Sequence, residues 1–101
     1  MEIKKSAMAG TLESSDICIV IEPNNSGIAI ELNSTVEKQF GKQIKKVIMD
    51  TLKALDIDNV IVRANDKGAL DCVIKARVET AVFRGAEISK IDWRGLNNVQ
   101  A

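Results

Sequence analysis

The segment spanning residues 10–16 carries the side chains best suited to hold a covalent group. It reads G-T-L-E-S-S-D and places two hydroxyls, those of Ser14 and Ser15, among polar neighbours. A phosphodiester needs a hydroxyl, and a phosphate-linked group needs an exposed serine rather than a core one. The same residue types are typical of loops and helix caps. On residue chemistry alone, the segment is either an attachment site or an ordinary loop.

The composition excludes the common nucleophilic and zinc-dependent catalytic sites. The chain has no histidine, so Ser–His–Asp and Cys–His arrangements and the commonest zinc ligand are absent. It also lacks the glycine-rich phosphate-binding motifs. Cys18 and Cys72 occur in apolar patterns, and we predict that both are small buried core residues. We expect no catalytic residue and no metal site.

Other side chains admit both a functional and a structural interpretation. The acidic pairs Asp56–Asp58 and Asp66–Asp71 can bind a cation, but without a full oxygen-ligand spacing they favour turns and helix caps. The lysines of the first expected helix form either a patch for an acidic partner or a solvated helix face. Trp93 is either an interface anchor or a partly buried core residue.

The charge balance argues against nucleic-acid and membrane partners. Lys and Arg total 14, Asp and Glu total 14, and the formal net charge is zero. A nucleic-acid or anionic-membrane binder usually shows a basic excess. No apolar run approaches the length of a membrane-spanning helix, and no apolar segment precedes residues 7–9 to form a signal peptide. We therefore expect a cytoplasmic protein with reduced cysteines.

Three β-branched runs predict strands. Residues 16–22 and 28–33 flank the turn-forming segment 23–27, which favours an antiparallel hairpin. A third strand is expected at residues 60–64.

Two segments with apolar residues three and four apart predict amphipathic helices. The first covers residues 36–55 and begins with a capping box at Ser34. The second covers residues 67–84, with Asp66 as its cap and Gly85 just past its end.

The expected order is β-β-α-β-α. Two amphipathic helices need a surface to cover, so we predict an α+β two-layer sandwich, a small mixed sheet with both helices on one face. The 101 residues divide into a flexible arm (1–15) with the candidate serine, an α+β domain (16–85) and a tail (86–101). The tail holds Ile88 and Ile91, and we expect an edge strand or a flap there.

Three segments, in order, resemble one known family. They are A-G-T-L-E-S at residues 9–14, T-V-E-K-Q-F-G at 35–41 and D-K-G-A-L-D-C at 66–72. Together they resemble the acyl carrier protein, or gamma subunit, of citrate lyase. By position, the resemblance implies that Ser14 bears the family's prosthetic group, with Ser15 as the less favoured alternative.

The resemblance implies a bacterial, cytoplasmic carrier in a three-subunit complex. The covalent group is 2'-(5''-phosphoribosyl)-3'-dephospho-CoA, which a prosthetic-group transferase attaches through a phosphodiester. Its thiol carries acetyl as a thioester. The alpha subunit exchanges that acetyl for citrate, and the beta subunit cleaves the citryl thioester to oxaloacetate. The carrier supplies no acid or base, and a mobile arm provides reach between the two active sites.

Three other interpretations stay open. The carrier subunit of malonate decarboxylase is similar in size and prosthetic group. A plain interaction module without a covalent group needs only a solvated arm and an amphipathic surface. A small stand-alone enzyme is the least favoured, because histidine is missing and the acidic clusters are weak.

Overall fold

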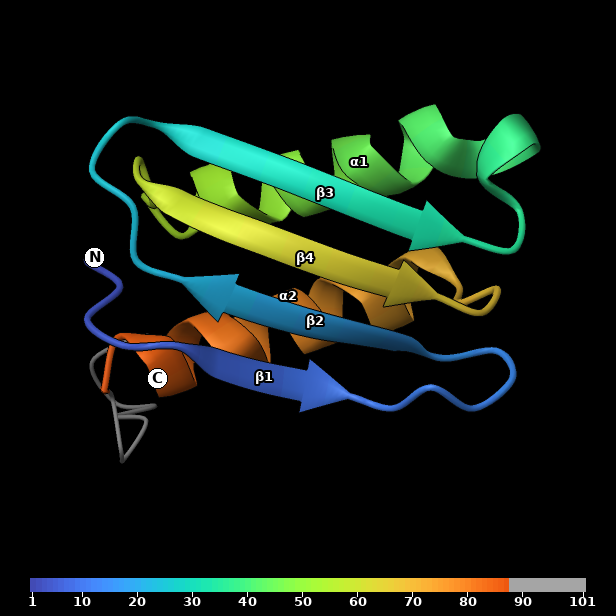
Figure 1. The fold of residues 1–101 in the computed structure, drawn as a ribbon, viewed down its shortest axis with the longest axis horizontal. Helices are drawn as coiled ribbons and strands as arrows, with labels where there is room; N and C mark the ends of the chain where they lie inside the picture. Colours follow the sequence, from blue (N-terminus) through green and yellow to red (C-terminus); the bar gives the residue numbers. More distant parts are fainter. Residues whose placement is uncertain (88–101) are drawn as a thin grey trace.

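The computed structural model describes residues 1–87, apart from the side chains of residues 37 and 38. Four strands form one mixed sheet in the order β1-β2-β4-β3, and both helices cover the same face of it (Figure 1). The elements are β1 (Ala7–Gly10), β2 (Ile17–Glu22), β3 (Ile28–Ser34), α1 (Glu37–Ala54), β4 (Val60–Asp66) and α2 (Asp71–Gly85). The predicted fold class, a small mixed sheet under two helices, is confirmed.

The core lies between the sheet and the helix layer. In β2, the alternate residues Ile17, Ile19 and Ile21 are fully buried on the helix-facing side. They meet the buried residues of β4, α1 and α2, which include Val60, Val62, Ile48, Leu52, Ile74 and Val78. Burying each such side chain stabilises the fold by roughly 1.5–3 kcal/mol, so this layer contact is the main favourable contribution to folding.

The predicted hairpin between residues 16–22 and 28–33, which form β2 and β3, is wrong. β2 and β3 are not neighbours, because β4 lies between them, antiparallel to β2 and parallel to β3. A parallel pair needs a crossover connection, and α1 supplies it. The segment after β2 is fastened to the start of β4 instead: the Gly27 N–H donates to Asn59 Oδ1 at 2.8 Å, and the Val60 N–H donates to the Gly27 carbonyl at 3.1 Å.

The predicted flexible arm is also wrong over much of its length. Residues Ala7–Gly10 form β1, which pairs antiparallel with β2 and adds a strand to the expected order. Ile3 and Ala9 are buried, and the Lys4 N–H donates to the Gly85 carbonyl at 2.8 Å. The sequence A-M-A-G does not alternate apolar with polar residues, so this edge strand depends on pairing with β2. Of the predicted arm, residues 11–15 form the exposed loop between β1 and β2.

Both predicted helices form, with corrected ends. α1 begins after Val36, so Ser34 is not its N-cap as predicted. The Ser34 Oγ accepts a hydrogen bond from the Val36 N–H at 3.1 Å and donates to Asp66 at 2.8 Å. α2 begins at Asp71, four residues later than expected, because residues 67–70 form a turn closed by Asp66 at the end of β4. Gly85 is the last residue of α2 rather than the residue beyond it.

Two residues expected in the core are exposed. Cys18 is buried as predicted, but Cys72 lies exposed in the first turn of α2. Phe40, an expected member of the apolar stripe of α1, is also exposed, since the start of that helix extends past the end of the sheet (Figure 1).

None of the helices described between residues 1 and 87 combines the length and apolarity needed to cross a bilayer. The expectations for Trp93 and for a strand or flap in the tail concern residues 88–101, outside the described part of the chain.

Gly85 offers a test of the contact between α2, β2 and the N-terminal segment. A Cβ at this position would lie 2.6 Å from Ile21 Cδ1 and 3.1 Å from the Lys5 carbonyl oxygen. We expect Gly85→Val to lower the free energy of unfolding by about 2 kcal/mol in urea titrations, because overpacking forces side chains and backbone to shift. Ala76→Val, on the exposed face of α2, is the control and should cost no more than about 0.7 kcal/mol. Equal losses in the two variants would contradict the packing described here.

Candidate functional site

The loop of residues 11–16 lies at the end of the sheet where β3 and β4 finish. The register pairs Gly10 with Cys18, Ile17 with Asp66 and Ser34 with Asp66. The loop therefore lies beside the connections that follow β3 and β4, on the right of Figure 1. We call this end of the molecule, comprising residues 11–16, 35–40 and 67–71, the serine end.

Ser14 is exposed within a turn of this loop. None of the side-chain hydrogen bonds among the described residues uses its hydroxyl; the loop's polar contacts run instead through Thr11 and Asp16. The Ser14 hydroxyl is therefore open to an approaching partner. Ser15 is also exposed, so the preference for Ser14 over Ser15 stays a prediction from the sequence.

The backbone beside Ser14 is joined to the turn after β4. The Ser15 N–H donates to the Lys67 carbonyl at 2.8 Å, and the Lys67 N–H donates to the Asp16 carbonyl at 2.9 Å. These two bonds continue the β2–β4 ladder past the end of the sheet. Ser15 has φ 65°, in the left-handed region that glycine adopts most easily. The loop is thus a shaped, anchored segment rather than an arm.

The Asp16 carboxylate is the polar centre of the loop. Arg77 of α2 donates to both oxygens, from Nε at 3.1 Å and from Nη2 at 2.9 Å. Thr11 Oγ1 donates at 2.6 Å and the Ile17 N–H at 2.7 Å. These donors stabilise the charged carboxylate, with Arg77 the largest cause, and hold the pKa of Asp16 far below its usual range. The same ion pair raises the pKa of Arg77.

Gly10 allows the chain to enter the loop. Its φ is +99°, and a Cβ would overlap the carbonyl oxygen of Ile17. A residue with a side chain cannot take this position without moving the backbone of β2. The turn into the loop therefore requires glycine here.

Asp66 organises the neighbouring turn. Its buried carboxylate accepts hydrogen bonds from Ser34 Oγ at 2.8 Å, from the Gly68 N–H at 3.0 Å and from the Ala69 N–H at 3.0 Å. Asp71, the other half of the acidic pair, accepts from Gln43 Nε2 at 2.9 Å. This pair therefore closes a turn and joins two helices, which is the structural interpretation. Between residues 1 and 87, no His, Cys, Asp and Glu side chains gather in a group able to hold a metal ion.

Sequence analysis missed the two residues that anchor the loop. Lys67 acts through its backbone, and no side-chain pattern indicates such a contact. The position of Arg77 could be recognised in the sequence. It lies between Ile74 and Ala81 on the apolar stripe of α2, where a charged side chain needs a partner.

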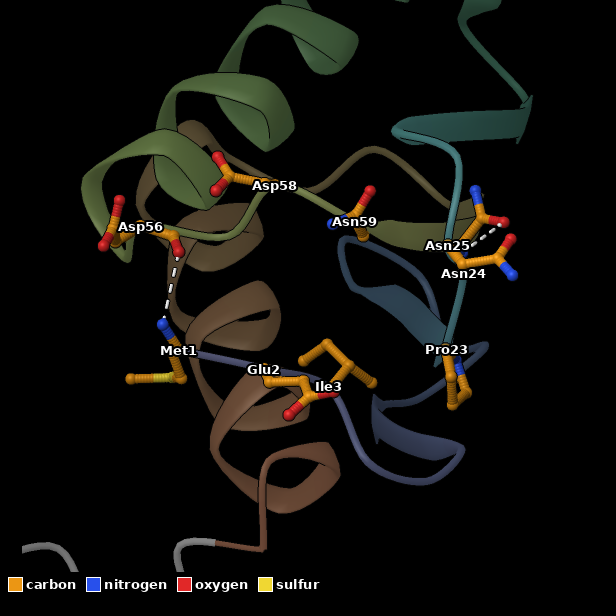
Figure 2. A pocket seen from close by; sticks show the side chains of 9 residues that line it. All are labelled: Met1, Glu2, Ile3, Pro23, Asn24, Asn25, Asp56, Asp58 and Asn59. Carbon is orange, nitrogen blue, oxygen red and sulfur yellow. Dashed lines mark hydrogen bonds between the residues drawn. The ribbon is translucent and has the colours of Figure 1, made fainter.

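A hollow lies at the other end of the sheet. It encloses about 700 Å³ and is lined by residues 1–3, 23–25, 56, 58 and 59. Figure 2 shows the Met1 amino group directed at the main-chain carbonyl of Asp56, 3.4 Å away. Since β4 has seven residues, the hollow and the Ser14 loop are roughly 20 Å apart. The candidate site is thus an exposed loop and not a cavity.

Comparison with known proteins identifies the family. A family model described as Malonate decarboxylase delta subunit (MdcD) matches residues 4–85. The citrate lyase acyl carrier protein of Lacticaseibacillus casei (strain BL23) is 60% identical over 97 residues, covering 96% of each chain. The protein of the same name from Streptococcus mutans is 52% identical over 102 residues, covering the whole of both chains.

The chain belongs to the citrate lyase acyl carrier protein family. Acyl carrier proteins are non-catalytic carrier subunits, and this chain is such a subunit. Its fold is similar to that of a chain in the crystal structure of a Pseudomonas malonate decarboxylase hetero-tetramer in complex with malonate. The TM-score is 0.72 at 18% identity, covering 83% of this chain and 87% of that one. That likeness shows a shared fold.

The Asp16–Arg77 pair gives a pH-dependent prediction for the carrier. The Asp16 pKa is lowered by folding, so its stabilisation is complete above the unfolded value of 3.8 and is lost as the pH falls below it. At pH 7 we expect Asp16→Asn to lower the free energy of unfolding by on the order of 1 kcal/mol. Urea titrations at pH 7, 5 and 2.5 should show this difference unchanged at pH 5 and smaller at pH 2.5.

Glu13→Gln is the matched control, because it neutralises an exposed carboxylate of the same loop. It should leave stability within about 0.5 kcal/mol of the original chain. A difference between Asp16→Asn and the original chain that grows toward pH 2.5 would contradict the ion-pair assignment.

Proposed function

We propose that this chain is the acyl carrier subunit of citrate lyase and that Ser14 bears 2'-(5''-phosphoribosyl)-3'-dephospho-CoA through a phosphodiester. The single observation that carries the proposal is the exposed, unengaged Ser14 hydroxyl on an anchored loop, in a chain 60% identical to a citrate lyase acyl carrier protein. The residues around Ser14 fit this linkage, since the loop leaves one side of the hydroxyl open to solvent. The thiol of the group supplies the thioester chemistry.

Attachment requires a partner that activates the serine. The Ser14 Oγ–phosphorus bond forms, the bond from phosphorus to the leaving phosphate of an anhydride donor breaks, and the hydroxyl proton passes to a base of the transferase. The chain has no histidine, and the nearby Asp16 carboxylate is already engaged by Arg77, Thr11 and a backbone amide. The base therefore comes from the prosthetic-group transferase.

The anchored loop changes how the carrier reaches its partners. A mobile arm was expected to move between the alpha and beta subunits, but backbone bonds to Lys67 and the ion pair to Arg77 hold the loop on the body. The reach then resides in the long prosthetic group, which concentrates its thiol near both active sites. Residues 11–16 fix the point from which that group extends.

Citrate lyase is favoured over malonate decarboxylase by the relatives at 52–60% identity. We propose the alpha subunit, for acyl exchange, and the beta subunit, for citryl cleavage, as partners in a cytoplasmic complex. The names of the relatives, and the hetero-tetramer of similar fold, support a place in a multi-subunit assembly.

The test is attachment to Ser14. Chain purified from its native host during growth on citrate should show an intact-mass increase matching the prosthetic group, localised by peptide fragmentation to Ser14. We expect Ser14→Ala to abolish both the increase and the lyase activity of the complex. Thermal stability should change by no more than about 0.5 kcal/mol, because the side chain is exposed and makes no side-chain hydrogen bond to the described residues.

Ser15→Gly is the matched control. It removes the neighbouring hydroxyl at a position with φ 65°, where glycine fits without strain, so attachment and folding should both persist. Attachment that survives Ser14→Ala and disappears in Ser15→Gly would move the site to Ser15. An unmodified chain with full partner function would replace the carrier proposal with the interaction module.

A further inference from the structure

Three large hydrophobic side chains are exposed at the serine end. Leu12 is 61% exposed, Leu70 is 70% exposed and Phe40 is 52% exposed. They come from three separate connections: the β1–β2 loop, the turn before α2 and the first turn of α1. Among residues 1–87, the other large exposed hydrophobics, Met1 and Met8, lie at the far end and within β1. Three large apolar side chains exposed at one end of the molecule make this end a candidate surface for another protein.

Hydrogen bonds fix the positions of the three segments that carry these side chains. Leu12 belongs to the loop that is bonded to Lys67 and, through Asp16, to α2. Leu70 is the N-cap residue of α2 and follows the turn closed by Asp66. The next residue, Asp71, accepts a hydrogen bond at 2.9 Å from Gln43, one turn of α1 after Phe40. A surface that is already formed loses little conformational entropy when a partner binds it.

We propose that Leu12, Leu70 and Phe40 form the docking surface for the transferase that attaches the prosthetic group. This inference rests on the proposed function of Ser14. The transferase must enclose the serine hydroxyl itself, so it has to contact the residues around the loop. Leu12 is two positions from Ser14, and Leu70 follows the turn that Lys67 joins to the loop. Three apolar side chains on a histidine-free surface offer contacts for recognition while leaving the acid–base chemistry to the partner.

The catalytic subunits have a different geometric requirement. They act on the far end of a long group, so their contacts with the body need not surround Ser14. The carrier therefore presents one surface to the enzyme that modifies it and keeps its remaining faces for the complex.

The test measures attachment kinetics for Leu12→Gln, Leu70→Gln and Phe40→Gln with purified transferase and the anhydride precursor of the group, followed by intact mass. Each substitution removes an exposed apolar anchor, so we expect the KM for the carrier to rise about tenfold while kcat changes little. Met8→Gln is the matched control, a similarly exposed side chain away from the serine end, and should keep the original KM. Circular dichroism and thermal unfolding should match the original chain in every variant.

A second measurement separates this surface from one used by the catalytic subunits. Each variant is fully modified by prolonged incubation with excess transferase, combined with the alpha and beta subunits, and assayed for citrate cleavage. Activity equal to that of the original chain is expected. Loss of cleavage activity in the modified variants, or an unchanged KM for attachment, would overturn the docking proposal. If the original chain is never modified at Ser14, the proposed function itself fails.

Discussion

Two backbone hydrogen bonds, between residues 15–16 and Lys67, decide the geometry of the serine end. They join a loop from the beginning of the chain to a turn that follows the central strand β4. Without them, residues 11–16 would be an untethered connection on the edge of the sheet. With them, the loop shares the rigidity of the β2–β4 ladder, and the Asp16–Arg77 pair adds a link to the helix layer.

The two aspartates at this end have complementary roles. Asp16 faces solvent on one side and neutralises a cation from α2, while Asp66 is buried and receives hydrogen bonds from its own turn and from Ser34. A buried carboxylate is tolerated because its donors compensate for lost hydration. Together the two aspartates hold the loop before β2 and the turn after β4 in place at the serine end. The body of the carrier therefore fixes the point from which the proposed covalent group would extend.

Periodicity was enough to predict most elements and not enough to predict their partners. The β-branched runs and the spacing of three and four mark β2, β3, β4 and both helices, because burial on one face leaves a pattern in the chain. The pairing of β2 with β4 leaves no such pattern, because the residues of β2 could pair equally well with β3 or with β4. β1 was not predicted because Ala7–Gly10, which holds three small residues and Met8, carries no strand pattern and forms a strand only against an existing edge.

The candidate site likewise contains residues that the sequence indicates and residues that only the structure reveals. Ser14 could be proposed because the resemblance assigns a role to one hydroxyl in a short segment, and its role stays a prediction. Lys67 could not be found, because it contributes backbone atoms, and Arg77 could be suspected only from its place on an apolar stripe. Leu70 and Phe40 fall within the segments predicted as amphipathic helices, but Leu70 precedes the observed start of α2 and Phe40 lies in the first turn of α1, and both are exposed.

The long sequence separation between the loop and its anchors also sets an order in time. Ser14 leaves the ribosome well before Lys67 and Arg77. The serine is therefore synthesised before the loop that presents it can form. The loop acquires its shape only when β4 has entered the sheet and α2 has packed behind it. The shape of the loop therefore reports that the whole domain has folded, and an enzyme that reads this shape would distinguish finished carriers from nascent or misfolded chains.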